Sequence, residues 1–360
     1  MYRSLINFRK TKYEVLQKLF ANSLDGVTEL NCFVSLDTVL KSLYGYKPDE
    51  ISESLAHAHS NSLSSEIINF AAHYRHYFWS RYGIPSNYFF YYSSGYAEYC
   101  CEINPAYRED YYNKHRGVNT VKEYAYINET VEKNIEFVKI ISAYLPNIYF
   151  LDSGRIEPAV LPQLLIQKNP ADEHTRNLIL TTYKNEYQLV NNKYTYILTL
   201  NGDDSRLYDK HGIIGTLYKS TDSVETVRTI RTHFSSKLYV AALAISGYPK
   251  YNITGTKGYS MLGVCKKLSS LLASNTIANV EYASLDEIAP YFPKADLQLI
   301  NNNYNILNLK YQAKIINNID YIRIKEQLVN KSDNMSLMNL NDKYYADNPL
   351  MLIELMEGEE

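Results

Sequence analysis

The sequence lacks the segments that mark membrane and secreted proteins. No run of about 18 apolar residues occurs, so no membrane-spanning helix is expected. The first ten residues contain neither the apolar core nor the cleavage site of a signal peptide. Cysteine is scarce, and no Cys-x-x-Cys motif is formed by the four copies, Cys32, Cys100, Cys101 and Cys265. We therefore expect an intracellular protein with reduced thiols, no structural zinc and no membrane association.

A strong net charge is missing as well. The 37 lysines and arginines nearly balance the 39 aspartates and glutamates, which gives a net charge of −2. Such a protein has no overall positive field that would attract DNA. The charges are unevenly distributed, however, because residues 1–18 are basic and residues 354–360 are acidic. A local basic surface is therefore compatible with the neutral total.

Tyrosine, in contrast, is in excess. The chain contains 36 tyrosines, a tenth of all its residues. Aromatic side chains can stack on the bases of single-stranded nucleic acid. The coding bias of an AT-rich genome is the favoured explanation, because the tyrosines are spread along the whole chain and do not form one group.

Short apolar segments alternate with helical patterns along the first two thirds of the chain. The segments that read as buried strands are residues 30–36, 88–92, 148–151, 177–182 and 194–200. Strands that alternate with helices predict an α/β fold with a doubly wound, mostly parallel sheet flanked by helices. Functional groups in such sheets gather at the carboxyl ends of the strands, which here fall at Asp37, Ser93, Asp152 and Thr182.

Three regions are expected from these patterns. Residues 1–30 form an N-terminal helical extension, and residues 31–235 form the α/β domain. Residues 236–360 form a mainly helical region with a helix–turn–helix part and a C-terminal segment.

Glycine is concentrated in one loop of this helical region. Of the 14 glycines, Gly247, Gly255, Gly258 and Gly263 fall within a short stretch that contains Lys257 and no carboxylate. An apolar helical period follows Ser260. A loop that opens into a helix presents backbone N–H groups that can face a phosphate.

This loop resembles the helix–hairpin–helix DNA-binding element of the flap endonuclease and 5′–3′ exonuclease superfamily, a PIN-like fold. The family pattern is roughly G-D-x-x-D-N-I-P-G-x-x-G-I-G, and Gly247, Asn252, Ile253, Gly255 and Gly258 match it. The two metal-binding aspartates of the pattern are replaced by Tyr248 and Tyr251.

Other family motifs occur in the same order, again with acids replaced. Asp37 matches the metal-binding aspartate after the first strand, and Glu157 is the one carboxylate kept from the family's Glu-Ala-Asp-Asp motif. Residues 105–116 resemble the phosphate-binding segment near the helical arch. Residues 181–189 resemble T-S-D-K-D-x-x-Q-L but lack both aspartates, one of which is replaced by Tyr183.

The resemblance implies that the scaffold is kept and most metal ligands are lost. The family's reaction uses two divalent cations about 4 Å apart, which several carboxylates must hold. We therefore expect a pseudoenzyme, encoded by a bacteriophage and present in the host cytoplasm, that needs no cofactor. It is expected to bind branched or single-stranded DNA, or to dock a partner of replication or transcription. The residues expected to contact DNA are Arg108, Lys114, Arg116, Lys184, Gly255, Lys257, Gly258 and Ser260.

Two alternatives stay open. In the first, the protein is a metal-dependent 5′–3′ exonuclease or flap endonuclease that holds Mg²⁺ or Mn²⁺ through the residual acids Asp37 and Glu157, helped by Asp152. In the second, the nuclease fold serves as a structural or virion-assembly component whose tyrosine-rich surface contacts other proteins.

Overall fold

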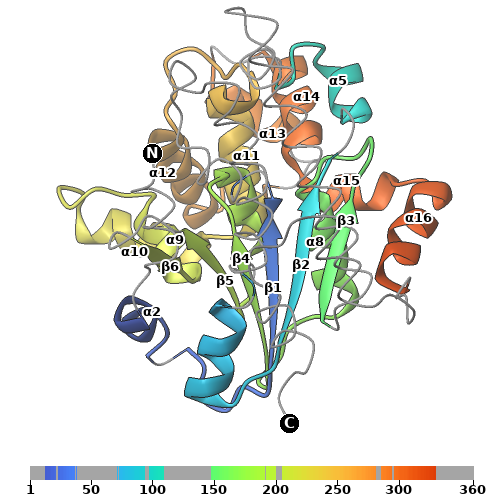
Figure 1. The fold of residues 1–360 in the computed structure, drawn as a ribbon. Helices are drawn as coiled ribbons and strands as arrows, with labels where there is room; N and C mark the ends of the chain where they lie inside the picture. The colour runs from blue at the N-terminus through green and yellow to red at the C-terminus, as the bar shows by residue number, and fades with distance from the viewer. Residues whose placement is uncertain are drawn as a thin grey trace, which may run out of the picture.

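A largely parallel sheet forms the centre of the computed structural model (Figure 1). The structure describes residues 13–21, 23–36, 38, 71, 73–93, 97–108, 147–190, 192–199, 205–280, 285–293 and 296–329. Within this part of the chain the sheet has six strands in the order β3-β2-β1-β4-β5-β6. These strands are β1 (Glu29–Ser35), β2 (Ser86–Tyr92), β3 (Ile148–Asp152), β4 (Thr175–Leu180), β5 (Thr195–Thr199) and β6 (Arg206–Tyr208). All five predicted strands and the parallel sheet are thus confirmed.

The two central strands, β1 and β4, contain consecutive buried residues because helices or loops cover both faces of the sheet there. Cys32 to Ser35 of β1 and Arg176 to Leu180 of β4 are buried without the alternation that an exposed face produces. At the edge, β5 and β6 pair antiparallel, with Ile197 opposite Tyr208. This pairing is the one that a hairpin requires, although the connection at 200–204 lies outside the described residues.

The order in which strands are added to the sheet reverses between β1 and β4. The chain adds β2 and then β3 on one side of β1, and it returns to place β4 and β5 on the other side. Ligands of open α/β sheets bind beyond the carboxyl ends of the strands at such a switch point. A ligand site is therefore expected at the ends of β1 and β4.

Helices surround the sheet and make up the chain after residue 235 in the described part. The α-helices are α2 (Tyr13–Phe20), α5 (Glu98–Ile103), α8 (Val160–Lys168), α9 (Lys210–Gly215), α10 (Val224–His233), α11 (Ser236–Ser246), α12 (Met261–Ala273), α13 (Leu285–Ile288), α14 (Leu297–Leu307), α15 (Leu309–Ile315) and α16 (Asn318–Val329). Short 3₁₀ helices are η2 (Lys184–Leu189), η3 (Pro249–Tyr251) and η5 (Ala289–Tyr291). Figure 1 shows α11 above the carboxyl end of β1 and α16 beside β3.

Helix α11 joins the two predicted main regions. Its residues from Leu238 to Ile245 are all buried, and a helix that is apolar on every side belongs inside a core. Ser235 caps it by accepting a hydrogen bond from the N–H of Leu238. The helix packs against η2 on the sheet side and against α12 and α14. One hydrophobic core thus crosses the boundary at 235/236, which itself stays a prediction.

No helix in the described residues combines the length and apolarity that crossing a bilayer requires.

Candidate functional site

Beyond the carboxyl ends of β1 and β4 lies a cluster of buried polar and aromatic side chains. We call it the edge cluster, and its members are Ser35, Tyr91, Tyr107, Arg108, Glu157, Tyr183, Glu186 and Tyr251. The cavity that most of them line has a volume of only about 10 Å³. That volume is at the lower limit for one water molecule. The side chains therefore fill the switch point almost completely.

An ion pair between Arg108 and Glu157 forms the centre of the edge cluster. Nη1 of Arg108 lies 3.4 Å from both carboxylate oxygens of Glu157, and the two side chains are 4% and 1% exposed. The hydroxyl of Tyr107 donates a 2.8 Å hydrogen bond to Oε2 of Glu157. Burial alone would lower the pKa of Arg108, but the adjacent Glu157 carboxylate raises this pKa well above its usual value. Arg108 therefore stays positively charged and neutralises Glu157.

The backbone holds Arg108 in this position. Its φ of 54° is in the left-handed region, which costs a non-glycine residue about 1–2 kcal/mol. Its N–H donates a 2.9 Å hydrogen bond to the carbonyl of Tyr251. Its guanidinium carbon lies 4.8 Å from the ring centroid of Tyr251 and 5.4 Å from that of Tyr183. Arg108 was expected from the sequence to bind a DNA phosphate; in the structure its guanidinium is enclosed and paired with Glu157.

Glu186 is a second buried acid, and no sequence motif had indicated it. It lies in η2, and it accepts a hydrogen bond from the hydroxyl of Tyr91 on β2. Burial raises the pKa of Glu186 to about 8; the nearby Glu157 adds to this rise, whereas the Tyr91 hydrogen bond and Arg108 oppose it. Glu186 is therefore protonated over most of the range below pH 8.

The tyrosines at positions where the resembled motifs have aspartate do not supply negative charge. Burial raises the pKa of Tyr248 and Tyr251 above the ordinary value, so both phenols are neutral near pH 7. Tyr248 instead has a structural contact, because its hydroxyl accepts a 3.1 Å hydrogen bond from the N–H of Lys184 at the start of η2. Tyr183 and Tyr251 pack at 5.7 Å between ring centroids.

The described residues of the edge cluster do not fit a pair of divalent metal ions. Magnesium and manganese need several anionic oxygens, yet Glu157 already neutralises Arg108 and Glu186 favours its protonated form. A fixed guanidinium at this point would repel a divalent cation. Asp152, the third acid considered, accepts a 2.8 Å hydrogen bond from the N–H of Gly154 and so caps a turn after β3. Asp37 lies outside the described residues, so its metal-binding role stays a prediction.

The glycine loop between α11 and α12 forms as the sequence predicts. Gly247 ends α11 with a φ of 77°, and Tyr248 forms an isolated antiparallel bridge with Ile253. A Cβ on Gly255 would lie 2.0 Å from the carbonyl oxygen of Ser246, so only glycine fits at this approach. Asn303 of α14 fastens the loop, because its Nδ2 donates to the carbonyls of Ala244 and Thr254.

The loop also carries most of the predicted DNA-contacting residues that the structure describes. Lys257, Gly258 and Ser260 are exposed, and the Ser260 hydroxyl accepts a 3.3 Å hydrogen bond from the N–H of Gly263 at the start of α12. Gly255 is half-buried beneath them. Their binding of DNA stays a prediction.

Lysines also lie at the rim of the edge cluster. Lys184, a predicted contact, is exposed at the start of η2. Lys250, which is not among the predicted contacts, is exposed in η3, and its Nζ lies 4.1 Å from the ring centroid of Tyr183. Lys114 and Arg116 lie outside the described residues, so no spatial relation to this rim is assigned to them.

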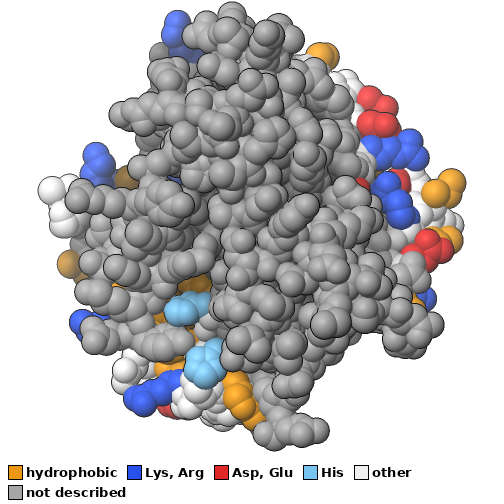
Figure 2. All heavy atoms as spheres, in the orientation of Figure 1, with side chains coloured by type: hydrophobic (Ala, Val, Ile, Leu, Met, Phe, Trp, Pro, Cys, Tyr) orange, Lys and Arg blue, Asp and Glu red, His pale blue; other side chains and the backbone are white. Residues whose placement is uncertain are grey.

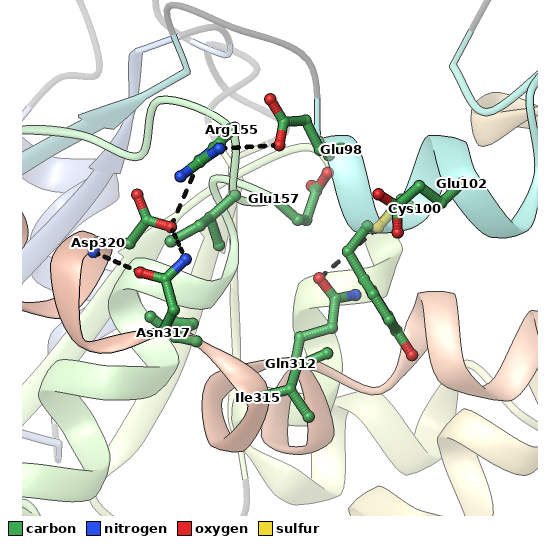
Figure 3. A pocket seen from close by; sticks show the side chains of 13 residues that line it. Glu98, Cys100, Glu102, Arg155, Glu157, Gln312, Ile315, Asn317 and Asp320 are labelled. Carbon is green, nitrogen blue, oxygen red and sulfur yellow. Dashed lines mark hydrogen bonds and ion pairs between the residues drawn. The ribbon is translucent and has the colours of Figure 1, made fainter.

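A second hollow of about 210 Å³ lies on the β3 side of the molecule, between α5, α15 and the start of α16 (Figure 3). Arg155 bridges its walls, with Nη1 3.3 Å from Glu98 and Nε 3.6 Å from Asp320. At the edge of Figure 2 on this side, basic, acidic and hydrophobic side chains lie together. The exposed apolar residues of α15 and α16 are Ile315, Ile319, Tyr321, Ile322 and Val329.

Comparison with known proteins shows similarity in structure but not in sequence. No family model and no curated protein matches the chain. A solved complex of the bacteriophage T5 D15 flap endonuclease with DNA and metal ions, described as a pseudo-enzyme–product complex, superposes with a TM-score of 0.51. The T5 D15 protein co-crystallised with metal ions gives 0.53. Each is 12% identical to this chain, and the match covers 91% of this chain and 99% of theirs. The chain therefore has the flap endonuclease fold that its motifs predicted.

Proposed function

We propose that this nuclease-fold protein binds branched or single-stranded DNA and does not cleave it. The buried Arg108–Glu157 pair is the observation that carries the proposal. It places a fixed positive charge among the residues that would have to hold metal ions, and Glu157, one of the two residual acids, is already paired in it. Cleavage by two metal ions requires that both ions be bound, and such a site does not favour their binding.

Exposed residues beside the glycine loop support DNA binding. The glycine loop holds the start of α12 in place, and Lys257 and Ser260 are exposed beside it. Helix N-termini of this kind favour phosphate groups. The T5 flap endonuclease of similar fold was solved with DNA, and we propose the same class of ligand here. We further propose a phage origin and action in the host cytoplasm.

Fluorescence anisotropy with labelled 5′-flap, single-stranded and blunt duplex DNA tests the proposal. We expect tighter binding of the flap or the single strand than of the duplex, and weaker binding of all three as salt rises. Lys257→Gln should weaken binding, whereas Lys325→Gln on α16, which lies beside β3, serves as a matched control. Absence of affinity for all three DNAs at low salt would refute DNA binding.

Docking of a protein partner is a second proposed function, favoured by α16. Ile319 is 74% exposed and Ile322 is 53% exposed on a helix that packs against β3. Exposed apolar side chains grouped with charged ones are typical of interaction surfaces. An Ile319→Ser, Ile322→Ser double variant should stay folded and lose association with a replication, transcription or assembly partner, measured by calorimetry with the purified partner. Unchanged affinity would exclude α16 as the docking surface.

A further inference from the structure

We infer that the hollow between α5, α15 and α16 takes a basic side chain of a protein partner, while apolar residues next to that side chain cover Ile319 and Ile322. The inference rests on the proposed docking of a protein at α16 and assigns the chemistry of the partner. The occupant is a protein segment in which lysine or arginine is flanked by apolar residues.

The size and the walls of the hollow suit one long side chain. Its volume of about 210 Å³ is below the roughly 300–1,000 Å³ of pockets that bind drug-sized ligands. Ile156, Ile315 and Ile316 contribute apolar walls, and Ile315 is 42% exposed. Lysine and arginine bury an apolar stem and keep a charged end in a polar environment. Such a side chain fits a hollow with apolar walls and charged groups at its mouth.

The charged side chains of the lining favour a positively charged occupant. They are Glu98, Glu102, Glu157, Asp320 and Arg155. Arg155 lies 3.3 Å from Glu98 and 3.6 Å from Asp320. Glu157 belongs to the buried ion pair of the edge cluster. Glu102, in contrast, forms no ion pair within the described part of the chain.

Glu102 is therefore the carboxylate that remains for a partner. It is exposed on α5, four residues after Glu98, so both side chains lie on the same side of the helix. Figure 3 shows Glu102 beside Cys100, on the wall away from Asp320. A basic side chain would pair with Glu102 without breaking an existing ion pair. An incoming carboxylate or phosphate would be repelled by Glu102 and would find Arg155 already paired.

Hydrogen bonds hold the walls of the hollow together. The N–H of Glu98 donates a 2.9 Å hydrogen bond to the carbonyl of Arg155. Sγ of Cys100 on α5 donates to Oε1 of Gln312 on α15 over 3.7 Å, and both residues are buried (Figure 3). Helix α5 is thereby fixed to the two walls that face it. A partner does not have to order these walls when it binds, which lowers the cost of binding.

Helix α16 is fixed to the end of β3 by its polar side chains. Nη2 of Arg323 donates a 2.6 Å hydrogen bond to the carbonyl of Ser153. The side-chain amide of Gln327 accepts a 2.7 Å hydrogen bond from the N–H of Asp152 and donates a 3.2 Å hydrogen bond to its carbonyl. These contacts position α16 from one side and leave the isoleucines on its other side exposed.

The exposed isoleucines lie next to the hollow. Ile319 and Ile322 are three residues apart on α16, and Asp320, which lines the hollow, lies between them in sequence. Since an α-helix rises 1.5 Å per residue, both are within about 3 Å of Asp320 along the helix axis. One short segment of a partner can therefore fill the hollow and cover both isoleucines. A charged anchor surrounded by apolar contacts is a common arrangement at protein interfaces.

Selection of a displayed library of random peptides on the wild-type protein tests the chemistry of the partner. We expect the enriched peptides to combine lysine or arginine with apolar residues. Synthetic copies of these peptides should bind an Ile319→Ser, Ile322→Ser double variant at least about tenfold more weakly, because two apolar side chains are lost from the contact. Calorimetry measures the affinities, and thermal melts check that both proteins are folded.

A double-mutant cycle then locates the basic side chain. Its lysine or arginine is replaced by glutamine in the peptide, and Glu102→Gln is made in the protein. Each change alone should weaken binding roughly fivefold, and the second change should add little once the pair is broken. Glu225→Gln is the matched control and should leave the affinity unchanged, because exposed Glu225 lies on α10, which packs against α9 at the β6 edge of the sheet.

The outcomes separate the inference from the docking on which it rests. Enriched peptides that need Ile319 and Ile322 but carry no basic residue overturn the inference, while docking at α16 stands. The same holds for basic peptides whose affinity does not respond to Glu102→Gln. If no peptide is enriched, or if the enriched peptides bind the isoleucine variant as tightly as the wild type, both are overturned.

Discussion

The edge cluster and the glycine loop both resemble motifs of one nuclease family, but they differ in which residues of those motifs this chain contains. The glycine loop has the glycines that its backbone requires, including Gly255 at its close approach to Ser246. In the edge cluster, Arg108 and Tyr183 lie among the acids Glu157 and Glu186. The fold of this chain therefore forms with tyrosine at positions 183, 248 and 251, where the resembled motifs have aspartate. Substitutions in each region can test this contrast.

The largest expected effect comes from breaking the buried ion pair. Arg108→Met leaves the Glu157 carboxylate buried without a partner, and we expect a loss of about 3–5 kcal/mol of unfolding free energy. Urea denaturation measures it. The Arg108→Met, Glu157→Leu double variant removes both charges and should recover most of the loss. A double variant as unstable as the single one would show that the charge pair is not what matters.

The next effect tests the glycine loop. Gly255→Ala introduces a methyl group 2.0 Å from a backbone oxygen, so we expect a loss of about 3 kcal/mol or more. Gly258→Ala is the matched control, because its φ of +90° is strained for alanine but no atom lies within 4 Å of the added carbon. That control should lose about 1–2 kcal/mol. Equal losses in denaturant titrations would contradict the close packing of the loop.

A smaller effect follows from the titration of Glu186. Its folded-state pKa of about 8 exceeds the ordinary 4.5, so its contribution to stability is full below pH 4.5 and is lost as pH rises toward 8. One such group changes stability by up to about 1.4 kcal/mol per pH unit in that window. Glu186→Gln should remove this pH dependence, so the stability of the variant relative to the wild type should increase as pH rises. Melting temperatures from pH 5 to 9 measure it.

The exposed Glu102→Gln is the control for that pH series, and it should leave the slope unchanged. A Glu186→Gln protein whose stability declines with pH as steeply as the wild type would remove Glu186 as the source.

The sequence predicts the parts of this molecule that depend on local patterns. Short segments of sequence were enough to predict two features, the buried strands β1 and β4 and the turn formed by the glycine loop. The Arg108–Glu157 pair could not be predicted in this way, because 49 residues separate its partners and no periodicity links them. Glu186 was missed because its burial depends on the packing of η2 against α11. Lys250 was missed because its contact with Tyr183 exists only after the loop has folded.

We propose that this nuclease-fold protein does not cleave DNA. A denaturing-gel time course with end-labelled 5′-flap DNA in manganese tests it most directly, with the wild type run beside Asp37→Ala. We predict intact DNA in both lanes at all times. Cleavage by the wild type that is absent from Asp37→Ala would contradict this proposal and establish a metal-dependent nuclease.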